Sequence, residues 1–350
     1  MPELPEVYAL VADLRARLVG RTLDRFDVVS FAALKTFDPP VSALAGRTIT
    51  GVSRHGKFLD LTFGAPQPDT AAPSADPPTG AATDLHLVMH LARAGWIRWR
   101  EGPPPAPSGR PGHGPLAARL VLTGKTGHET GKQGHETGKS GDESGEPGNQ
   151  SGTAHPSSDT GDEPGTDAGS GLNITEAGTK KSLAIYVVKD PNEVPGIARL
   201  GPDPLSEGFT LEVFSGILHA AGRAQIKGVL RNQSVIAGIG NAYSDEILHA
   251  AHMSPFKPAA MTDDETERLF DALNSTVRGA IERSDGLAAS DLKREKKLGL
   301  QVHGKKGEAC PVCGDTVRQV TYADSSLQYC PTCQTGGKPL ADRVLSRLLK

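Results

Sequence analysis

Two pairs of cysteines near the end of the chain restrict its fold more than any other feature. Each pair has the spacing Cys-x-x-Cys, sixteen residues separate the pairs, and together they are all the cysteines of the chain: Cys310, Cys313, Cys330 and Cys333. Four thiolates at this spacing bind one tetrahedral zinc ion, and because sulfur fills all four positions the metal is expected to be structural. So small a module cannot fold by its core alone, so zinc would supply its folding energy. Two disulfides are the alternative, which the absence of a secretory signal disfavours.

The net charge of −3 conceals an uneven distribution along the chain. The segment 125–181 carries ten acidic and five basic side chains, whereas the segment 291–350 carries eleven Lys/Arg against six Asp/Glu. A basic C-terminal region is typical of proteins that bind a phosphate backbone, although ordinary surfaces can also be basic. Zinc ribbons contact either proteins or nucleic acids, and the lysines just upstream of this one favour nucleic acid. Because no apolar run has the length of a membrane span, we expect a cytoplasmic protein with no membrane partner.

Two segments have the composition of unstructured insertions. The first, about 65–83, is rich in proline and alanine, and the second, about 125–179, contains the hexapeptide GHETGK twice. Such sequences bury too little apolar surface to offset the entropy cost of ordering them. The repeated histidines, His128 and His135, are therefore expected to belong to a disordered repeat and not to a metal site.

Outside these insertions the hydrophobic pattern predicts an α+β architecture. Apolar residues from Val7 to Leu18 recur at helical spacing, and the chain from Thr210 to about Leu292 also has helical periodicity. Short β-like runs lie between these two regions, at Thr48–Val52, Phe58–Phe63, Leu85–His90, Trp96–Trp99, Ala118–Leu122 and Ala184–Val188. Strands separated by turn residues predict a sandwich or barrel, with both insertions in loops between strands. We expect an N-terminal β-sandwich with a leading helix, then a helical domain and a small C-terminal zinc module.

The start of the chain and a glycine-rich turn carry the remaining chemical motifs. Removal of Met1 would leave Pro2 with a secondary amine, which is partly unprotonated at neutral pH and can form a Schiff base. Glu3 beside it could move protons. The structural alternative places Pro2 in the first turn of a helix, with Glu3 and Glu6 complementing the helix dipole. The GIGN turn at 238–241 precedes a helix whose first N–H groups would form a phosphate site, unless the turn is only a tight helical hairpin.

Four motifs together resemble the formamidopyrimidine-DNA glycosylase and endonuclease VIII family. They are MPELPE at the start, HGKFLDL at 55–61, QIKGVLRNQSVIAGIGNAYSDEIL at 225–248 and the four-cysteine module at 310–333, in the order of the family. The resemblance covers most of the chain outside the two insertions. It implies a helix–two-turn–helix motif at 225–251 and a zinc finger at 310–333.

The resemblance implies a base-excision DNA repair enzyme, a DNA glycosylase with abasic-site lyase activity. In that family the N-terminal proline attacks C1′ of a damaged nucleotide flipped from the duplex, and the strand is cut by β- and δ-elimination through a Schiff base. Carried over to this chain, Pro2 is the nucleophile, Glu3 the general acid/base, and Lys57 contacts phosphate or assists β-elimination. Asn241 would hold a phosphate, and Lys227 is a further candidate DNA contact. A monomer with one structural zinc and damaged DNA as its partner is expected.

Three positions depart from the family pattern. Ser325 stands where the family's finger has a phosphate-binding arginine, Arg93 stands where a methionine fills the void of the flipped base, and DPNE at 190–193 replaces a run with further void-filling residues. Loss of the void-filling side chains weakens extrusion of a stacked base but leaves chemistry at an exposed aldehyde possible. We therefore expect lyase activity more firmly than activity on oxidised purines.

The expected domain order places the catalytic β-sandwich at 1–195, a linker at 196–206, the helix–two-turn–helix domain at 207–298, the zinc finger at 301–335 and a tail at 336–350. Two other functions stay open at this stage. One is a catalytically silent protein of the same fold that binds DNA or lesions. The other is a zinc-ribbon regulatory factor, which would give no reason for the N-terminal motif.

Overall fold

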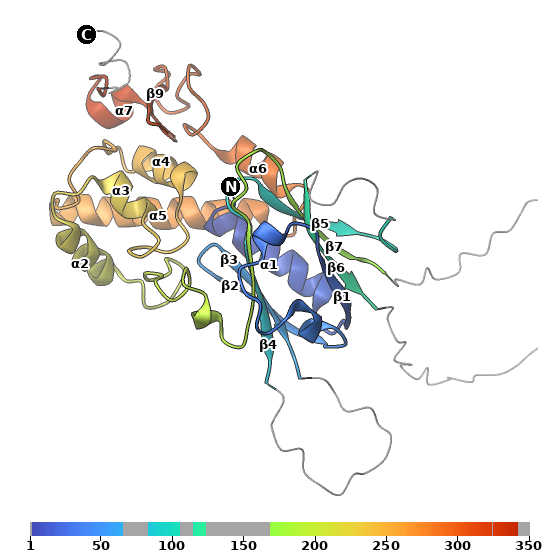
Figure 1. The fold of residues 1–350 in the computed structure, drawn as a ribbon. Helices are drawn as coiled ribbons and strands as arrows, with labels where there is room; N and C mark the ends of the chain where they lie inside the picture. Colours follow the sequence, from blue (N-terminus) through green and yellow to red (C-terminus); the bar gives the residue numbers. More distant parts are fainter. Residues whose placement is uncertain (1, 66–82, 106–114, 124–168, 324, 342–350) are drawn as a thin grey trace, which may run out of the picture.

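The computed structural model describes residues 2–65, 83–105, 115–123, 169–323 and 325–341. Within these residues the chain forms an N-terminal domain of two β-sheets, a helical domain and a small C-terminal finger (Figure 1). The expected α+β class, with its leading helix and C-terminal cysteine module, is confirmed. Most of both expected insertions and of the tail lies outside the described residues.

Two antiparallel four-stranded sheets make the N-terminal domain. One has the order β1-β6-β7-β5 and the other the order β2-β3-β4-β8. Their bounds are β1 Leu23–Val28, β2 Ile49–His55, β3 Phe58–Phe63, β4 Leu85–His90, β5 Gly95–Arg100, β6 Leu116–Leu122, β7 Gly171–Glu176 and β8 Ala184–Val188, with short 3-10 helices at Phe31–Ala33, Val41–Leu44 and Pro191–Glu193. Apolar side chains from both sheets share one core with helix α1 (Leu4–Leu18), so the helix is part of the sandwich domain.

Strand β7 corrects the predicted extent of the second insertion. It lies inside the segment 125–179, which was expected to be unstructured, yet it pairs with β5 on one side and β6 on the other. Its alternate residues Leu172 and Ile174 are fully buried. Burial of these two side chains in the middle of a sheet offsets the entropy cost of ordering a polar, glycine-rich sequence. Strand β1 was likewise not predicted.

The helical domain is joined to the sandwich by the first turn of α1. Its helices are α2 (Leu211–Ala221), α3 (Ile226–Arg231), α4 (Asn241–Ala250), α5 (Asp263–Ser284) and α6 (Leu292–Gly299). Leu4 packs in the core of this domain, whereas Val7 and Leu10, further along α1, pack in the sandwich core. Helix α1 therefore bridges the two domains. The helices of the described residues are too short or too polar to cross a lipid bilayer.

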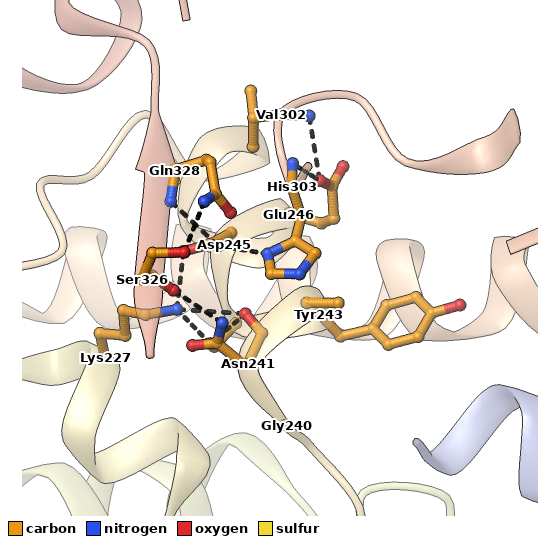
Figure 2. A network of polar contacts seen from close by, with 12 residues as sticks. Lys227, Gly240, Asn241, Tyr243, Asp245, Glu246, Val302, His303, Ser326 and Gln328 are labelled. Atoms are coloured by element: carbon orange, nitrogen blue, oxygen red, sulfur yellow. Dashed lines mark hydrogen bonds and ion pairs between the residues drawn. The ribbon is translucent and has the colours of Figure 1, made fainter. Parts of the chain in front are cut away.

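Two adjacent carboxylates on α4 attach the finger, which comprises β9 (Arg318–Thr321), β10 (Ser326–Tyr329) and α7 (Pro331–Thr335) (Figure 2). Asp245 Oδ2 accepts hydrogen bonds from the His303 ring, at 2.7 Å, and from the backbone of Gln328, at 3.1 Å. Glu246 accepts three backbone N–H groups from residues 301–303, at 2.8–3.0 Å. Both carboxylates are buried, so the finger and the segment leading to it are held by charge-assisted hydrogen bonds.

Lys227, predicted as a DNA contact, lies inside this network. Its ammonium donates to Asp245 Oδ1 at 2.6 Å, Ser244 Oγ at 2.7 Å and the Asn241 carbonyl at 3.1 Å, which uses all three of its hydrogens. The residue is only 5% exposed. The structure therefore does not support a direct DNA contact by Lys227: its position is that of a buried counter-ion for Asp245.

Replacement of Lys227 by methionine tests this assignment. Lys227→Met would leave Asp245 buried without its cation, and we expect the free energy of unfolding to fall by about 3–5 kcal/mol in urea denaturation. The matched control is Lys257→Met, whose ion pair with Glu265 has both side chains 28% exposed, and which should cost only about 0–1 kcal/mol. A variant as stable as wild type, with weaker and less salt-dependent DNA binding, would restore Lys227 as a DNA contact.

Candidate active site

The carboxylate of Glu3 lies at the N-terminus of helix α4. It accepts hydrogen bonds from the backbone N–H groups of Gly240 at 2.8 Å, Ala242 at 3.0 Å and Tyr243 at 3.2 Å. These groups form the positive end of the helix and favour an anion. The GIGN turn was predicted to offer these donors to a phosphate. The structure corrects that expectation, because the anion at the helix start is Glu3 of the same chain.

The glycines of the turn allow the N-terminal segment to approach this closely. A Cβ atom on Gly240 would lie 2.4 Å from Glu3 Cδ, far inside contact distance. Gly238 has φ +87°, and a Cβ there would lie 2.5 Å from Leu4 Cδ1. Both glycines are therefore required by residues 3 and 4, one by lack of space and the other also by its left-handed backbone.

A second carboxylate and a lysine complete the surroundings of Glu3. Lys296 Nζ, from α6, lies 2.6 Å from Glu6 Oε2 and 3.9 Å from Glu3 Oε1. The same ammonium lies 4.7 Å from the centre of the Tyr243 ring, and the Tyr243 hydroxyl donates to Glu6 Oε1 at 2.7 Å. Glu6 also accepts the backbone N–H of Glu3 at 2.8 Å, so it fixes both the lysine and the backbone that carries the catalytic candidate.

Burial and charge shift the pKa values of these groups strongly. Burial of Glu3 opposes its ionisation, but Lys296, Lys57 and two backbone N–H groups outweigh it and lower the pKa of Glu3 to about 2. Burial of Lys57 disfavours its ammonium and, despite the attraction of Glu3, lowers the pKa of Lys57 to about 8. Burial, together with Glu6, raises the pKa of the Tyr243 hydroxyl, which therefore stays protonated as a donor. At neutral pH the site thus holds an ionised Glu3 beside cationic lysines.

Two adjoining cavities open on either side of residues 2 and 3. The larger, a cleft of about 720 Å³, is lined by Glu3 and Lys57, and the smaller, of about 350 Å³, by Pro2 and Trp96. Four residues line both: Arg93, Lys296, His303 and Gly304. The cleft thus has the candidate nucleophile and the candidate acid/base at the boundary between two spaces, which suits a ligand that enters both.

The structure brings most of the predicted site residues together. Pro2, Glu3, Lys57 and Asn241 all line these cavities, whereas Lys227 does not. Lys57 Nζ donates to the carbonyl of Ile239 in the GIGN turn at 2.8 Å. Asn241 Nδ2 donates to the carbonyl of Ser326 in the finger at 2.7 Å, and its Oδ1 has no hydrogen-bond partner in the described part of the chain. The expected phosphate contact of Asn241 would therefore compete with a contact to the finger.

The departures from the family pattern have different locations. Arg93 and Ser325 line the cleft, so these two substitutions change its wall. Asn192 and Glu193 belong to a 3-10 helix capped by Asp190 and line neither cavity.

Sequence reasoning missed several residues of the site. Glu6, Tyr243, Lys296, Arg231 and Gln233 were not predicted to take part. The spacing of Glu3 and Glu6 is that of a capping box, which the structure contains and which could have indicated Glu6. Lys296 lies in the run KREKK, whose three lysines all line the smaller cavity, and only the fold distinguishes the one that also lines the larger cleft.

The four cysteines lie close enough together to bind one metal ion. Their sulfur atoms are all within 4.8 Å of one another, with Cys310 and Cys333 at 3.9 Å and Cys313 and Cys330 at 3.3 Å. Tetrahedral zinc, with Zn–S bonds of about 2.3 Å, needs sulfur atoms about 3.8 Å apart. The donor set therefore fits such an ion.

Comparison with known proteins identifies the family. The chain matches the formamidopyrimidine-DNA glycosylase N-terminal domain at residues 1–130 and the H2TH domain of the same enzyme at residues 200–291. A formamidopyrimidine-DNA glycosylase of Thermus thermophilus is 30% identical over 347 residues, covering 96% of this chain and all of the relative. An uncharacterised formamidopyrimidine-DNA glycosylase-like protein of Mycobacterium tuberculosis is 54% identical over 152 residues, 43% of this chain and 94% of the relative. The chain belongs to the formamidopyrimidine-DNA glycosylase family, as its motifs indicated.

Solved structures of this family share the fold. The Lactococcus lactis enzyme in complex with DNA that contains an oxidised pyrimidine has a TM-score of 0.68 and 23% identity, covering 95% of this chain and 100% of the other. The same enzyme bound non-covalently to DNA with an abasic site has a TM-score of 0.66 and 22% identity, covering 95% and 99%. The expected sandwich, helical and finger arrangement is thus confirmed as that of the family.

Substitution of Gly240 tests the contact between Glu3 and α4. Its backbone has φ −127°, which any residue adopts, so Gly240→Ala acts only through the clash of its Cβ with the Glu3 carboxylate. We expect the free energy of unfolding to fall by about 1–3 kcal/mol in urea denaturation because the site is overpacked. In the control Gly228→Ala, in α3, the new Cβ meets nothing within 4 Å, and this variant should be more stable than wild type by about 0.5–1 kcal/mol. Equal stability of wild type and Gly240→Ala would contradict the described approach of Glu3.

Proposed function

We propose that this protein is a base-excision DNA repair enzyme, a DNA glycosylase with abasic-site lyase activity. The single observation that carries the proposal is the buried, ionised Glu3 directly after Pro2, at the boundary of two cavities in a cleft lined with cations. Membership of the family and the likeness to relatives that bind damaged DNA support damaged DNA as the partner.

In the proposed reaction the amine of Pro2, freed by removal of Met1, attacks C1′ of the damaged nucleotide. The base or, at an abasic site, the C1′ hydroxyl departs with a proton from solvent. The C1′–O4′ bond then opens, the N–H proton of Pro2 passes to O4′, and a cationic iminium joins Pro2 to C1′ of the opened sugar. Glu3, whose pKa is lowered to about 2, stays ionised through this step and stabilises the positive charge beside it. The carboxylate then accepts and returns protons as the strand is cut by β- and δ-elimination.

Lys57 and Asn241 are proposed to contact the DNA backbone. Lys57 donates one hydrogen to the Ile239 carbonyl, which leaves two for a phosphate in the cleft. Asn241 would exchange its contact with Ser326 for a phosphate, or keep it and position the finger against the strand.

We further propose that Cys310, Cys313, Cys330 and Cys333 bind one structural zinc ion. Elemental analysis of the purified protein should find about one zinc per chain, and Cys330→Ser should lose the metal and the fold of the finger, seen as increased proteolysis after residue 300. Ser325, a half-buried residue of the finger that is no ligand, serves as control: Ser325→Ala should retain the metal. Disulfides with no bound zinc in the protein purified without reductant would exclude this proposal.

Borohydride trapping on abasic-site DNA tests the proposed chemistry. We expect the processed protein, with Pro2 at its N-terminus, to form a covalent adduct that is reduced and retained on a denaturing gel. Glu3→Gln keeps the shape of the side chain but removes its charge, and should slow strand cleavage by about 10²-fold or more. Protein that retains an uncleaved N-terminal extension should form no adduct until the extension is removed.

Two outcomes would contradict this proposal in different ways. An adduct formed by the extended protein would show that an internal amine, with Lys57 and Lys296 as candidates in the cleft, is the nucleophile. No adduct with the processed wild type, in spite of tight binding to abasic DNA, would identify a silent lesion-binding protein of the same fold.

A further inference from the structure

The walls of the larger cleft differ in charge. Its cations come from the sandwich domain, Lys57 and Arg93, and from the helical domain, Arg231 and Lys296. The finger contributes Gln319, Ser325, Ser326 and Gln328 to the lining, and none of these four residues is charged. A strand of DNA in the cleft would therefore find its cationic contacts outside the finger.

Arg231 differs from the lysines of this cleft in having no hydrogen-bond acceptor or ion-pair partner for its side chain among the described residues. Lys57 donates to a carbonyl and Lys296 pairs with Glu6. Within the described part of the chain, the guanidinium of Arg231 makes neither a hydrogen bond nor an ion pair, although the side chain is half-buried. Its charge also lowers the pKa of both Lys57 and Lys227, so it repels two buried ammonium groups. A half-buried cation with these neighbours calls for an anion from outside the chain.

Gln233 links the backbone of Arg231 to the carbonyl that Lys57 contacts. Arg231 is the last residue of α3, and its carbonyl accepts a hydrogen bond from Gln233 Nε2 at 2.8 Å. The same Gln233 nitrogen donates to the carbonyl of Ile239 at 2.6 Å, which is also the acceptor for Lys57 Nζ. One glutamine therefore ties the start of the arginine side chain to the atom that orients the lysine.

We propose that Arg231 is a phosphate-binding residue of this enzyme, whose guanidinium grips a backbone phosphodiester of the DNA strand in the cleft beside Lys57. The inference rests on the proposed function and adds a binding residue to it. A guanidinium presents two parallel N–H groups to a phosphate and binds it in a fixed orientation, which a lysine cannot do. Arg231 thereby supplies the bidentate contact that the uncharged finger wall lacks.

The test measures binding to a duplex with a tetrahydrofuran abasic analogue, which cannot form a Schiff base, as a function of salt. Arg231→Gln should weaken binding about tenfold to a hundredfold and lower the slope of log K against log salt by about 0.9. Arg231→Lys should keep the slope but still weaken binding, because the charge remains and the bidentate geometry is lost. The matched control is Arg278→Gln, which removes an exposed arginine of α5 outside the cleft and should leave the slope unchanged.

A second variant separates loss of a contact from loss of the fold. Ser325 faces the same cleft from the finger, so Ser325→Arg in the Arg231→Gln background should restore the slope and much of the affinity. An unchanged slope in Arg231→Gln, or an equal change in Arg278→Gln, would overturn the inference. If wild type binds and traps abasic DNA, and Arg231→Gln has the same affinity and the same salt slope, only this inference fails. If wild type neither binds nor traps, the proposed function itself fails.

Discussion

The position of the candidate active site depends on one carboxylate, Glu3, at the start of helix α4. Three backbone N–H groups bind it, and Leu4 beside it packs into the core of the helical domain. The rest of α1 packs in the sandwich, so the hydrogen bonds of Glu3 span the junction of the two domains. A buried charge costs much free energy without its partners, so this junction has little freedom to shift. The same contacts therefore hold the domains together and place residue 2 at the cleft.

Helix α4 connects this junction to the cysteine module. Its first N–H groups hold Glu3, while Asp245 and Glu246 in its middle hold the segment 301–303 and strand β10. Lys227 lies beside Asp245 as its buried counter-ion. Since Asn241 at the start of α4 also donates to the finger, a displaced finger would disturb the turn that orients Glu3 and Lys57. The cluster of four cysteines is thus coupled to the catalytic candidates through one helix.

Local patterns predicted the elements of this fold better than the contacts between them. The spacing of apolar residues in 7–18 and the short β-like runs depend on neighbouring residues, and both were found. Strand β7 was missed because its short alternation of Leu172 and Ile174 directly follows a long polar, glycine-rich segment, and its pairing on both sides is not visible in the sequence. The roles of Lys227 and of the GIGN turn were misjudged for a similar reason. A lysine or a helix N-terminus in a motif does not reveal whether its partner comes from DNA or from a distant part of the chain.

The presence of an ionised carboxylate in a cleft for an anionic strand has a physical explanation in the surrounding lysines. Lys296 and Lys57 lower the pKa of Glu3, and by the same attraction they cancel its repulsion of a nearby phosphate. Glu3 also directly follows Pro2, where a cationic iminium would develop. One set of ion pairs can therefore serve two opposite demands, attraction of the DNA backbone and stabilisation of positive charge on the sugar. Because both demands are met by fixed groups, little reorganisation is needed when the reaction begins.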